Sequence, residues 1–271
     1  RSFPLLSCII YPYFCALLRT SFFKNMNILV CLSQVPDTTT RIVFTADGKS
    51  LDKNGVQFII NPYDELALTK ALELNESMGG GRVTVVHVGR ADSESNLRKA
   101  MAIGADQAIR VDSDATDAIQ VARELAAIAS KDRYDLILCG RESIDYNGGM
   151  VGGMLAELLG LPLVNIMTSI SSNGTEAEVS FDVDGGRAYA QVAHPFVATC
   201  QKELTEPRIP NMRGIMQART KPLEVVAASV NAEQTQVSHY EPPVAKSGCK
   251  FVDAGDMDQL VSLLHEQSKV I

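Results

Sequence analysis

The chain has 271 residues, of which 46% are hydrophobic and 21% are charged, and its formal net charge at pH 7 is −7. This composition is typical of an ordinary soluble globular protein with one or two domains. An acidic chain excludes nucleic acid and anionic membrane surfaces as main partners, because both require a basic face. The six cysteines form no Cys-x-x-Cys pair and the four histidines show no metal-ligand spacing, which predicts reduced core cysteines in a cytoplasmic protein without a metal site.

The first 25 residues differ from the rest of the chain. Residues 4–18 form an apolar run that is followed by Arg19 and Lys24. Such a run is short for a membrane span, and its positive charges lie on the wrong side for a signal peptide. A strand pattern begins at Met26, so we expect residues 1–25 to be a non-native extension. The alternative is a form that associates with a membrane through residues 1–25.

From Met26 onward, short apolar runs alternate with helical patterns. In chain order, the expected strands and helices are strand 28–32, helix 62–78, strand 83–88, helix 93–103, strand 108–111, helix 115–130, strand 136–139 and helix 149–159. This alternation predicts an α/β fold with a mostly parallel, doubly wound sheet and helices on both faces. Between the first strand and the first helix, Asp47 and Gly48 mark a turn between segments 41–44 and 55–60, which predicts an inserted hairpin.

The chain changes character after Pro162. Segments 176–183 and 188–192 flank a turn, and segment 195–200 is again strand-like. We therefore expect residues 163–200 to add antiparallel strands to the sheet. Residues 223–255 contain few strand signals, and residues 258–269 have the spacing of an amphipathic helix, so an extended C-terminal arm is expected.

The most informative segment, residues 140–153, joins the strand at 136–139 to the following helix. Its glycines include Gly140, Gly148 and Gly149. A loop of this kind aims free backbone N–H groups and the positive end of a helix dipole at an anion, which predicts a phosphate cradle. The alternative is a turn without a ligand, in which Asp145 or Asn147 caps the helix. Because carboxyl ends of parallel strands meet at one edge, the loops after residues 32, 88 and 139 are expected to share one ligand.

Residues 205–222 form a second unusual segment. It combines prolines and cations with the apolar residues Met212, Ile215 and Met216. Apolar side chains in an exposed loop indicate a contact surface. The alternative is that these side chains pack on their own domain.

Five motifs, which follow one another along the chain, resemble the β subunit of electron transfer flavoprotein. They are Cys31-Leu-Ser-Gln-Val-Pro-Asp-Thr, Asn61-Pro-Tyr-Asp-Glu-Leu-Ala-Leu, Lys99-Ala-Met-Ala-Ile-Gly-Ala-Asp, segment 140–162 and Arg208-Ile-Pro-Asn-Met-Arg-Gly-Ile-Met-Gln-Ala-Arg. Each motif alone is weak, but together they span nearly all of the chain from Met26 to Ile271. The resemblance implies an electron-carrying subunit of a heterodimer, not an enzyme.

What the resemblance implies extends to fold, cofactors and partners. The fold would be adenine-nucleotide α-hydrolase-like, with a structural AMP in this subunit and an FAD held mainly by the α subunit. Electrons would pass from flavin dehydrogenases, such as the acyl-CoA dehydrogenases of fatty acid β-oxidation, to electron transfer flavoprotein-quinone oxidoreductase or an equivalent acceptor, in a bacterial cytoplasm. The nucleotide-binding domain would cover residues 26–222, with a partner-recognition loop at 205–222, and residues 223–271 would form the C-terminal arm and helix that dock on the α subunit.

The resemblance also implies site residues. The cofactor-binding positions are Cys31, Asn61, Pro62, Tyr63, Asp64, Val88, Gly140, Arg141, Glu142, Ser143, Ile144, Asp145, Tyr146, Asn147, Gly148, Gly149, Met150 and Val151. Tyr63 matches a family aromatic near the flavin ring. The partner-recognition positions are Arg208, Pro210, Asn211, Met212, Arg213, Ile215, Met216 and Arg219. Met212 stands where the family often has an anchoring leucine, and no catalytic or metal-binding residue is expected.

The phosphate loop departs from the family pattern. Many relatives have Asp-Gly-Asp-Thr-Ala/Gly-Gln where residues 145–150 read Asp-Tyr-Asn-Gly-Gly-Met. The loss of the threonine and glutamine leaves three states open: AMP, a second FAD as in the electron-bifurcating branch, or no nucleotide. Two other classes of function also remain, an enzyme that hydrolyses adenine nucleotides or transfers adenylate, and a homodimeric nucleotide sensor. The enzyme needs a pyrophosphate-gripping loop after the first strand, which the sequence from Ser33 to Pro36 lacks.

Overall fold

The computed structural model describes residues 25–229, 234–244 and 248–270. The expectation for residues 1–25 therefore falls almost entirely outside the described residues. The chain divides into two units. The larger unit consists of the chain up to Arg41 together with Lys53–Gln236, and the smaller unit consists of Ile42–Asp52 together with the chain from Val237 onward. In the described ranges, no helix combines the length and the apolar character that crossing a membrane requires.

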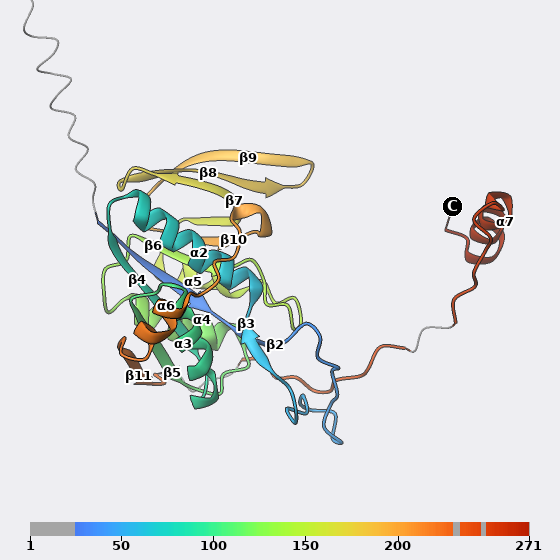
Figure 1. The fold of residues 1–271 in the computed structure, drawn as a ribbon, viewed down its shortest axis with the longest axis horizontal. Helices are drawn as coiled ribbons and strands as arrows, with labels where there is room; N and C mark the ends of the chain where they lie inside the picture. Colours follow the sequence, from blue (N-terminus) through green and yellow to red (C-terminus); the bar gives the residue numbers. More distant parts are fainter. Residues whose placement is uncertain (1–24, 230–233, 245–247, 271) are drawn as a thin grey trace, which may run out of the picture. The chain divides into compact units, whose positions relative to one another are not determined.

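A nine-stranded sheet runs through the larger unit (Figure 1). Its strand order is β11-β5-β4-β1-β6-β10-β7-β8-β9. The strands are β1 (Met26–Leu32), β4 (Gly81–Val88), β5 (Gln107–Asp112), β6 (Leu136–Gly140), β7 (Leu163–Ser172), β8 (Glu176–Val183), β9 (Gly186–Ala193), β10 (Phe196–Cys200) and β11 (Leu223–Ala227). Pairs from β11 to β7 are parallel, and the two pairs that involve β8 are antiparallel. The predicted α/β fold with a mostly parallel sheet is confirmed.

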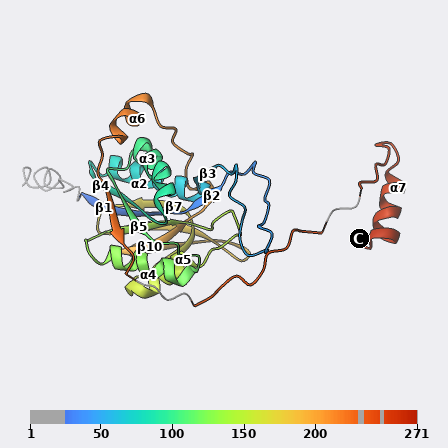
Figure 2. The ribbon, with the colours of Figure 1, turned by 90° about the horizontal axis from the view of Figure 1, so that it is seen from below.

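Helices cover both faces of this sheet (Figure 2). One face carries α2 (Pro62–Ser77), α3 (Glu94–Ile103) and α6 (Met212–Ala218), and the other carries α4 (Ala118–Ala129) and α5 (Val151–Leu159). Two short 3₁₀ turns, η1 (Ala91–Ser93) and η2 (Lys202–Leu204), complete the unit.

Two buried clusters fill the space between the sheet and its helices. Ile28 and Val30 of β1 belong to the cluster that contains Leu68 of α2, whereas Leu29 belongs to the cluster that contains Leu155 of α5. Successive side chains of a strand point to opposite faces, and a strand covered on both faces must be apolar throughout. This explains why β1 appears in the sequence as a continuous apolar run.

The order of strands reverses beside β1. Along the chain, β4 and β5 are added on one side of β1, whereas β6 is added on the other. In open α/β sheets, ligands bind outside the carboxyl ends of the strands at such a point. The fold therefore singles out the ends of β1 and β6.

Three parts of the sheet differ from the sequence predictions. Strand β10 is parallel to both neighbours and lies between β6 and β7, so the prediction that it is antiparallel was wrong. The tract expected to contain few strands begins with β11, which pairs with β5. The predicted hairpin was wrong in its pairing, because β3 (Phe58–Ile60) pairs with β2 (Gln34–Pro36).

The smaller unit joins a turn to the C-terminal part of the chain. Phe44 forms a bridge with Leu51 and stacks on Tyr240, with ring centroids 5.0 Å apart. The Tyr240 N–H donates to the Gly48 carbonyl at 2.7 Å. Further along, α7 (Met257–Ser262) continues into the π-helical segment η3 (Leu263–Ser268), which confirms the predicted C-terminal helix.

Candidate functional site

The carboxyl ends of β4, β1 and β6 lie next to one another, because these strands are neighbours in the sheet. Cys31 is paired with Val86 in the β1–β4 ladder, and Val88 ends β4. Gly140 ends β6 and opens the glycine-bearing loop. The structure thus brings the three loops predicted to share a ligand to one edge.

Asp64 links two of these strand ends. Its Oδ2 atom accepts hydrogen bonds from the backbone N–H and the hydroxyl of Ser33, both at 2.6 Å. Its Oδ1 atom accepts from the Gly140 N–H at 2.8 Å. Asp64 is 4% exposed, and burial raises the pKa of its carboxyl to about 6, although the hydrogen bonds from Ser33, Gly140 and Asn61 act to lower it. One buried carboxylate therefore holds the chain after β1 and the end of β6.

Gly140 lies tightly against the start of α2. A Cβ atom on Gly140 would lie 2.2 Å from Asp64 Oδ1 and 2.8 Å from Tyr63 Cβ. Contacts this short are not tolerated, so glycine is required here by close approach and not by backbone conformation. The strand-to-helix loop is thereby held against the N-terminus of α2.

Asn61 precedes α2 and joins it to the same loop. Its side-chain amide donates to the Glu142 carbonyl at 2.8 Å, and its backbone N–H donates to the Ser33 carbonyl at 3.0 Å. The side chain is 1% exposed, and its Oδ1 atom has no hydrogen-bond partner among the described residues. A buried oxygen without a partner is costly, and a ligand donor would satisfy it.

The loop from Gly140 to Val151 is closed by a bridge between Ser143 and Gly148, and Asn147 within it has a φ of 57°. Helix α5 begins at Val151, with Met150 as the N-cap residue and no capping side chain among the described residues. The alternative in which Asp145 or Asn147 caps this helix was therefore wrong. The first N–H groups of α5 remain available to an anion.

The loop residues differ in exposure. Five of them are exposed: Asp145, Tyr146, Asn147, Gly149 and Met150. The others are half-buried: Gly140, Arg141, Glu142, Ser143, Ile144, Gly148 and Val151. Pro62 and Tyr63 at the start of α2 are also half-buried. Backbone N–H groups, a serine hydroxyl and an uncapped helix end are a donor set that fits a phosphate group.

Two buried thiols lie beneath this edge. Cys31 and Cys139 are 6% and 5% exposed. A hydrogen bond with Cys139, together with burial, holds the pKa of the Cys31 thiol well above its ordinary value. Cys31 therefore contributes as a neutral, weakly polar surface.

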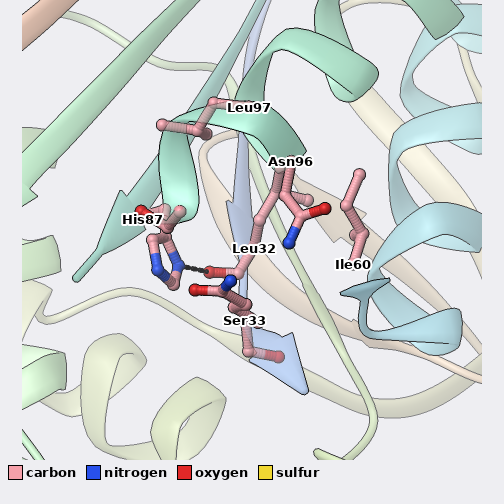
Figure 3. Close-up of a pocket in the computed structure, with 8 residues that line it drawn as sticks. Leu32, Ser33, Ile60, His87, Asn96 and Leu97 are labelled. Atoms are coloured by element: carbon pink, nitrogen blue, oxygen red, sulfur yellow. Dashed lines mark hydrogen bonds between the residues drawn. The ribbon is translucent and has the colours of Figure 1, made fainter. Parts of the chain in front are cut away.

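A small cavity lies beside the end of β1 (Figure 3). Its volume is ≈ 10 Å³, which is about enough for one water molecule. His87 lines it, and the His87 Nδ1 atom lies 2.8 Å from the Leu32 carbonyl. Burial lowers the pKa of His87, so its ring is neutral at pH 7. The cavity is too small for a nucleotide. The candidate site is therefore the edge of the sheet outside the carboxyl ends of β1 and β6, where the strand order reverses and where open α/β sheets bind ligands in a crevice.

Arg110 supports the third loop and was not singled out by the sequence analysis. This side chain is buried, and it donates to the Gly89 carbonyl at 3.0 Å and to Glu94 Oε1 at 3.1 Å. Gly89 also donates its N–H to the Val111 carbonyl at 3.0 Å. An arginine inside an otherwise apolar strand was the available signal.

The segment around α6 lies apart from this crevice and packs against α3. Three of its apolar side chains are exposed, Met212 by 74%, Ile215 by 41% and Met216 by 68%. Arg208 binds Glu76 through both carboxylate oxygens at 2.7 and 3.0 Å, and this pairing lowers the pKa of Glu76. The other predicted recognition residues are Pro210, which is half-buried, and the exposed Asn211, Arg213 and Arg219.

Comparisons with known proteins show the family of the chain. Residues 49–231 match the family model of the electron transfer flavoprotein domain. The chain is 36% identical to the electron transfer flavoprotein subunit beta of Bacillus subtilis over 91% of this chain and all of that protein. It is also 36% identical to the subunit of the same name from Syntrophomonas wolfei, over 84% of this chain and 91% of that protein. Its identity to the subunit of the same name from Sus scrofa is 31%, over 91% of this chain and 99% of that protein. The chain therefore belongs to the electron transfer flavoprotein β-subunit family.

Proposed function

We propose that this chain is the non-catalytic β subunit of a heterodimeric electron transfer flavoprotein that binds AMP in the crevice between β1 and β6. The observation that carries the proposal is the uncapped N-terminus of α5 at the point where strand order reverses. That position is where an open α/β sheet binds phosphate-containing ligands. The FAD, held mainly by the α subunit, supplies the electron-carrying chemistry.

The residues of the chain have distinct roles in this proposal. The loop from Gly140 to Val151 and the N–H groups of α5 receive the phosphate of AMP. The Oδ1 atom of Asn61, which is buried without a partner among the described residues, accepts a hydrogen bond from the nucleotide. Cys31 and Val88 line the adenine and ribose, and Tyr63 at the start of α2 faces the flavin.

The exposed side chains of α6 form the docking surface for flavin dehydrogenases. Met212, Ile215 and Met216 supply the apolar contact, and the exposed Arg213 and Arg219 supply positive charge beside it. A small apolar anchor with a charged rim suits transient, electrostatically steered association with acidic partners. Arg208 differs in role, because its pairing with Glu76 anchors the segment to α2.

The C-terminal arm is proposed to dock on the α subunit. Its exposed apolar residues include Phe251 at 92%, Val261 at 54% and Val270 at 67%. Apolar side chains at this exposure are typical of a segment that folds onto a partner surface. The acceptor of the electrons is a quinone oxidoreductase or an equivalent protein, and the proposed location is the cytoplasm.

The test is to co-express the chain with an α subunit, purify the complex and identify the nucleotides released by heat. One FAD and one AMP per heterodimer are expected. Two FAD per heterodimer would mean that a second flavin occupies the site proposed for AMP, which would indicate an electron-bifurcating protein. A flavin-free homodimer would contradict the carrier function, and ATP hydrolysis by that homodimer would support the enzyme on the same fold.

A further inference from the structure

We propose that Asp64 is a positioning residue that holds the β1 and β6 ends in the nucleotide-binding arrangement. The proposal rests on the proposed function for the identity of the nucleotide. We call the link that the Asp64 carboxylate makes between the ends of β1 and β6 the clamp, and it rests on the hydrogen bonds that Asp64 makes.

The first observation is that β1 and β6 separate before they end. Their paired residues run only from Ile28 with Leu136 to Val30 with Leu138. Strand β1 continues to Leu32 and β6 continues to Gly140. Past the last pair, the two strands therefore lack each other as hydrogen-bond partners at the site where a ligand would enter.

The second observation is that the Asp64 carboxylate fills this gap. It accepts from the N–H of Ser33 on one side and from the N–H of Gly140 on the other, at 2.6 and 2.8 Å. These are the donors that a continued β1–β6 ladder would engage. A short side chain from the first turn of α2 thus links the two strand ends beyond the point where their ladder stops.

The third step concerns charge. An ionised carboxylate accepts hydrogen bonds at both oxygens, whereas an asparagine amide carries an NH₂ donor in place of one of them. The Ser33 N–H, the Ser33 hydroxyl and the Gly140 N–H donate to Asp64, and the Asn61 side chain is a further partner. Asp64→Asn would therefore turn an N–H donor toward a backbone N–H donor and weaken the link between the strands.

The neighbouring titratable groups do not replace this charge. The thiols nearest in the sheet are Cys31 of β1, Cys139 of β6 and Cys200 of β10, and burial contributes to raising the pKa values of Cys31 and Cys200. On α2 itself, Glu65 pairs with Lys99. Burial raises the pKa of Asp64 to about 6, so its side chain is mostly ionised at pH 7.5.

The decisive experiment measures amide hydrogen exchange at Ser33 and Gly140 by NMR in the full chain. Protection factors at pH 7.5, corrected for intrinsic exchange, are expected to fall about tenfold at both amides in Asp64→Asn, because hydrogen bonds to a charged group are lost. Unchanged protection in the variant would overturn the proposal. In the unmodified chain both amides should be strongly protected, and fast exchange there would overturn the proposal without any variant.

Asp37→Asn is the matched control, since the Asp37 carboxylate bonds only locally to Thr39 at 2.6 and 2.9 Å. This variant should leave both protection factors unchanged. Equal losses in Asp37→Asn and Asp64→Asn would show a general effect of charge removal and overturn the clamp.

AMP affinity, measured by calorimetry in the same samples, separates the clamp from the proposed function. The AMP phosphate itself titrates near pH 6, so the ratio between Asp64→Asn and the unmodified chain is the relevant quantity. The variant should bind AMP about tenfold more weakly at pH 7.5. If exchange behaves as expected but AMP does not bind, the clamp stands and the AMP site is wrong. Unchanged affinity together with unchanged protection in Asp64→Asn would overturn the clamp.

Discussion

At the scale of single residues, Gly140 is the position that tolerates least change. An alanine Cβ would overlap Asp64 Oδ1 and Tyr63 Cβ, at 2.2 and 2.8 Å. Overpacking of a well-packed site costs about 1–3 kcal/mol. We expect Gly140→Ala to lower the free energy of unfolding in urea by about 2 kcal/mol and to weaken AMP binding.

Gly186→Ala is the control for this prediction. Gly186 starts β9, and a Cβ atom there would meet nothing within 4 Å. The urea unfolding midpoint of Gly186→Ala should match that of the unmodified chain. A Gly140→Ala variant as stable as Gly186→Ala would show that the start of α2 moves freely away from β6.

Asp64 should also leave a signature in the pH dependence of stability. Its pKa is raised from 3.8 to about 6 in the folded chain, so between these values the folded state binds more protons than the unfolded state. The contribution of Asp64 to the free energy of unfolding is therefore highest below pH 4 and falls by about 3 kcal/mol in all as the pH rises to 6.

The measurement is urea unfolding of the unmodified chain and of Asp64→Asn at several pH values. Other carboxylates titrate in both proteins, so the difference between the two curves isolates Asp64. The unmodified chain should lose stability relative to the variant from pH 4 to pH 6. A constant difference across this range would show that Asp64 keeps an ordinary pKa.

The sequence indicated which residues surround the crevice but not what they do. Asn61, Asp64 and Gly140 were all predicted as cofactor positions. The role of Asp64 depends on bonds to Ser33 and Gly140, which are 31 and 76 residues away in the sequence. Such contacts follow from strand order, which local patterns do not contain.

At the scale of elements, α6 and α3 cap each other. The Arg98 guanidinium donates to the Ala218 and Lys221 carbonyls at 2.7 and 2.8 Å. The Lys221 ammonium donates to three carbonyls at the end of α3, which belong to Met101, Gly104 and Ala105, at 3.1, 3.3 and 2.6 Å. Cations at helix C-termini satisfy carbonyls that lack helical partners. This exchange holds the exposed face of α6 in place.

Lys221→Met tests this capping. Loss of hydrogen bonds to a charged group costs about 1.5–3 kcal/mol, so the variant should be destabilised by about 2 kcal/mol in urea, with faster hydrogen exchange at residues 101–105 and 212–218. Lys131→Met, at the exposed turn after α4, is the control and should change neither quantity. Faster exchange only in α3 would mean that α6 is held by other contacts.

The exposed side chains of α6 also lead to a prediction about function. Met212 is 74% exposed, and full burial of a methionine is worth about 1.5–3 kcal/mol. Met212→Ala should therefore raise the KM for the carrier about tenfold in electron transfer from a flavin dehydrogenase, with kcat and thermal stability unchanged. Val225→Ala, on β11 and 50% exposed, should leave KM unchanged. A fall in kcat alone would place Met212 outside the docking surface.

Elements with strong local signals were predicted well, and those defined by pairing were not. The alternation from β1 to α5 was visible because buried parallel strands are apolar runs and their helices are amphipathic. The parallel direction of β10 was hidden, since residues 196–200 would have the same apolar pattern in either direction. Likewise, β3 pairs with β2 and not with its nearest strand-like segment, because turn signals do not determine which segments meet.

At the scale of the whole molecule, segments that lie far apart in the sequence build the smaller unit. Phe44 and Tyr240 stack with an interplanar angle of 6°, and the Gly48 carbonyl accepts from the Tyr240 N–H. The His239 ring lies so close to Gly48 that a Cβ atom there would be 2.2 Å away. The turn at residues 42–52 is therefore held by the arm and not by a neighbouring strand.

This arrangement predicts that the arm protects the turn from proteolysis. An aromatic pair contributes about 0.5–1.5 kcal/mol beyond its burial, and a change of 1.4 kcal/mol in local opening alters cleavage about tenfold when reclosing is fast. Tyr240→Ala should thus speed tryptic cleavage after Lys49 by up to about tenfold. The products are followed by mass spectrometry under native conditions.

Phe251→Ala is the matched control, because Phe251 belongs to the same unit and is 92% exposed. If Tyr240→Ala and Phe251→Ala are cleaved at the same rate as the unmodified chain, the stack does not limit opening of the turn. If both are cleaved faster, the arm as a whole protects the turn and the single contact does not. Selective sensitivity of Tyr240→Ala would mean that the Phe44–Tyr240 stack itself limits opening of residues 42–52.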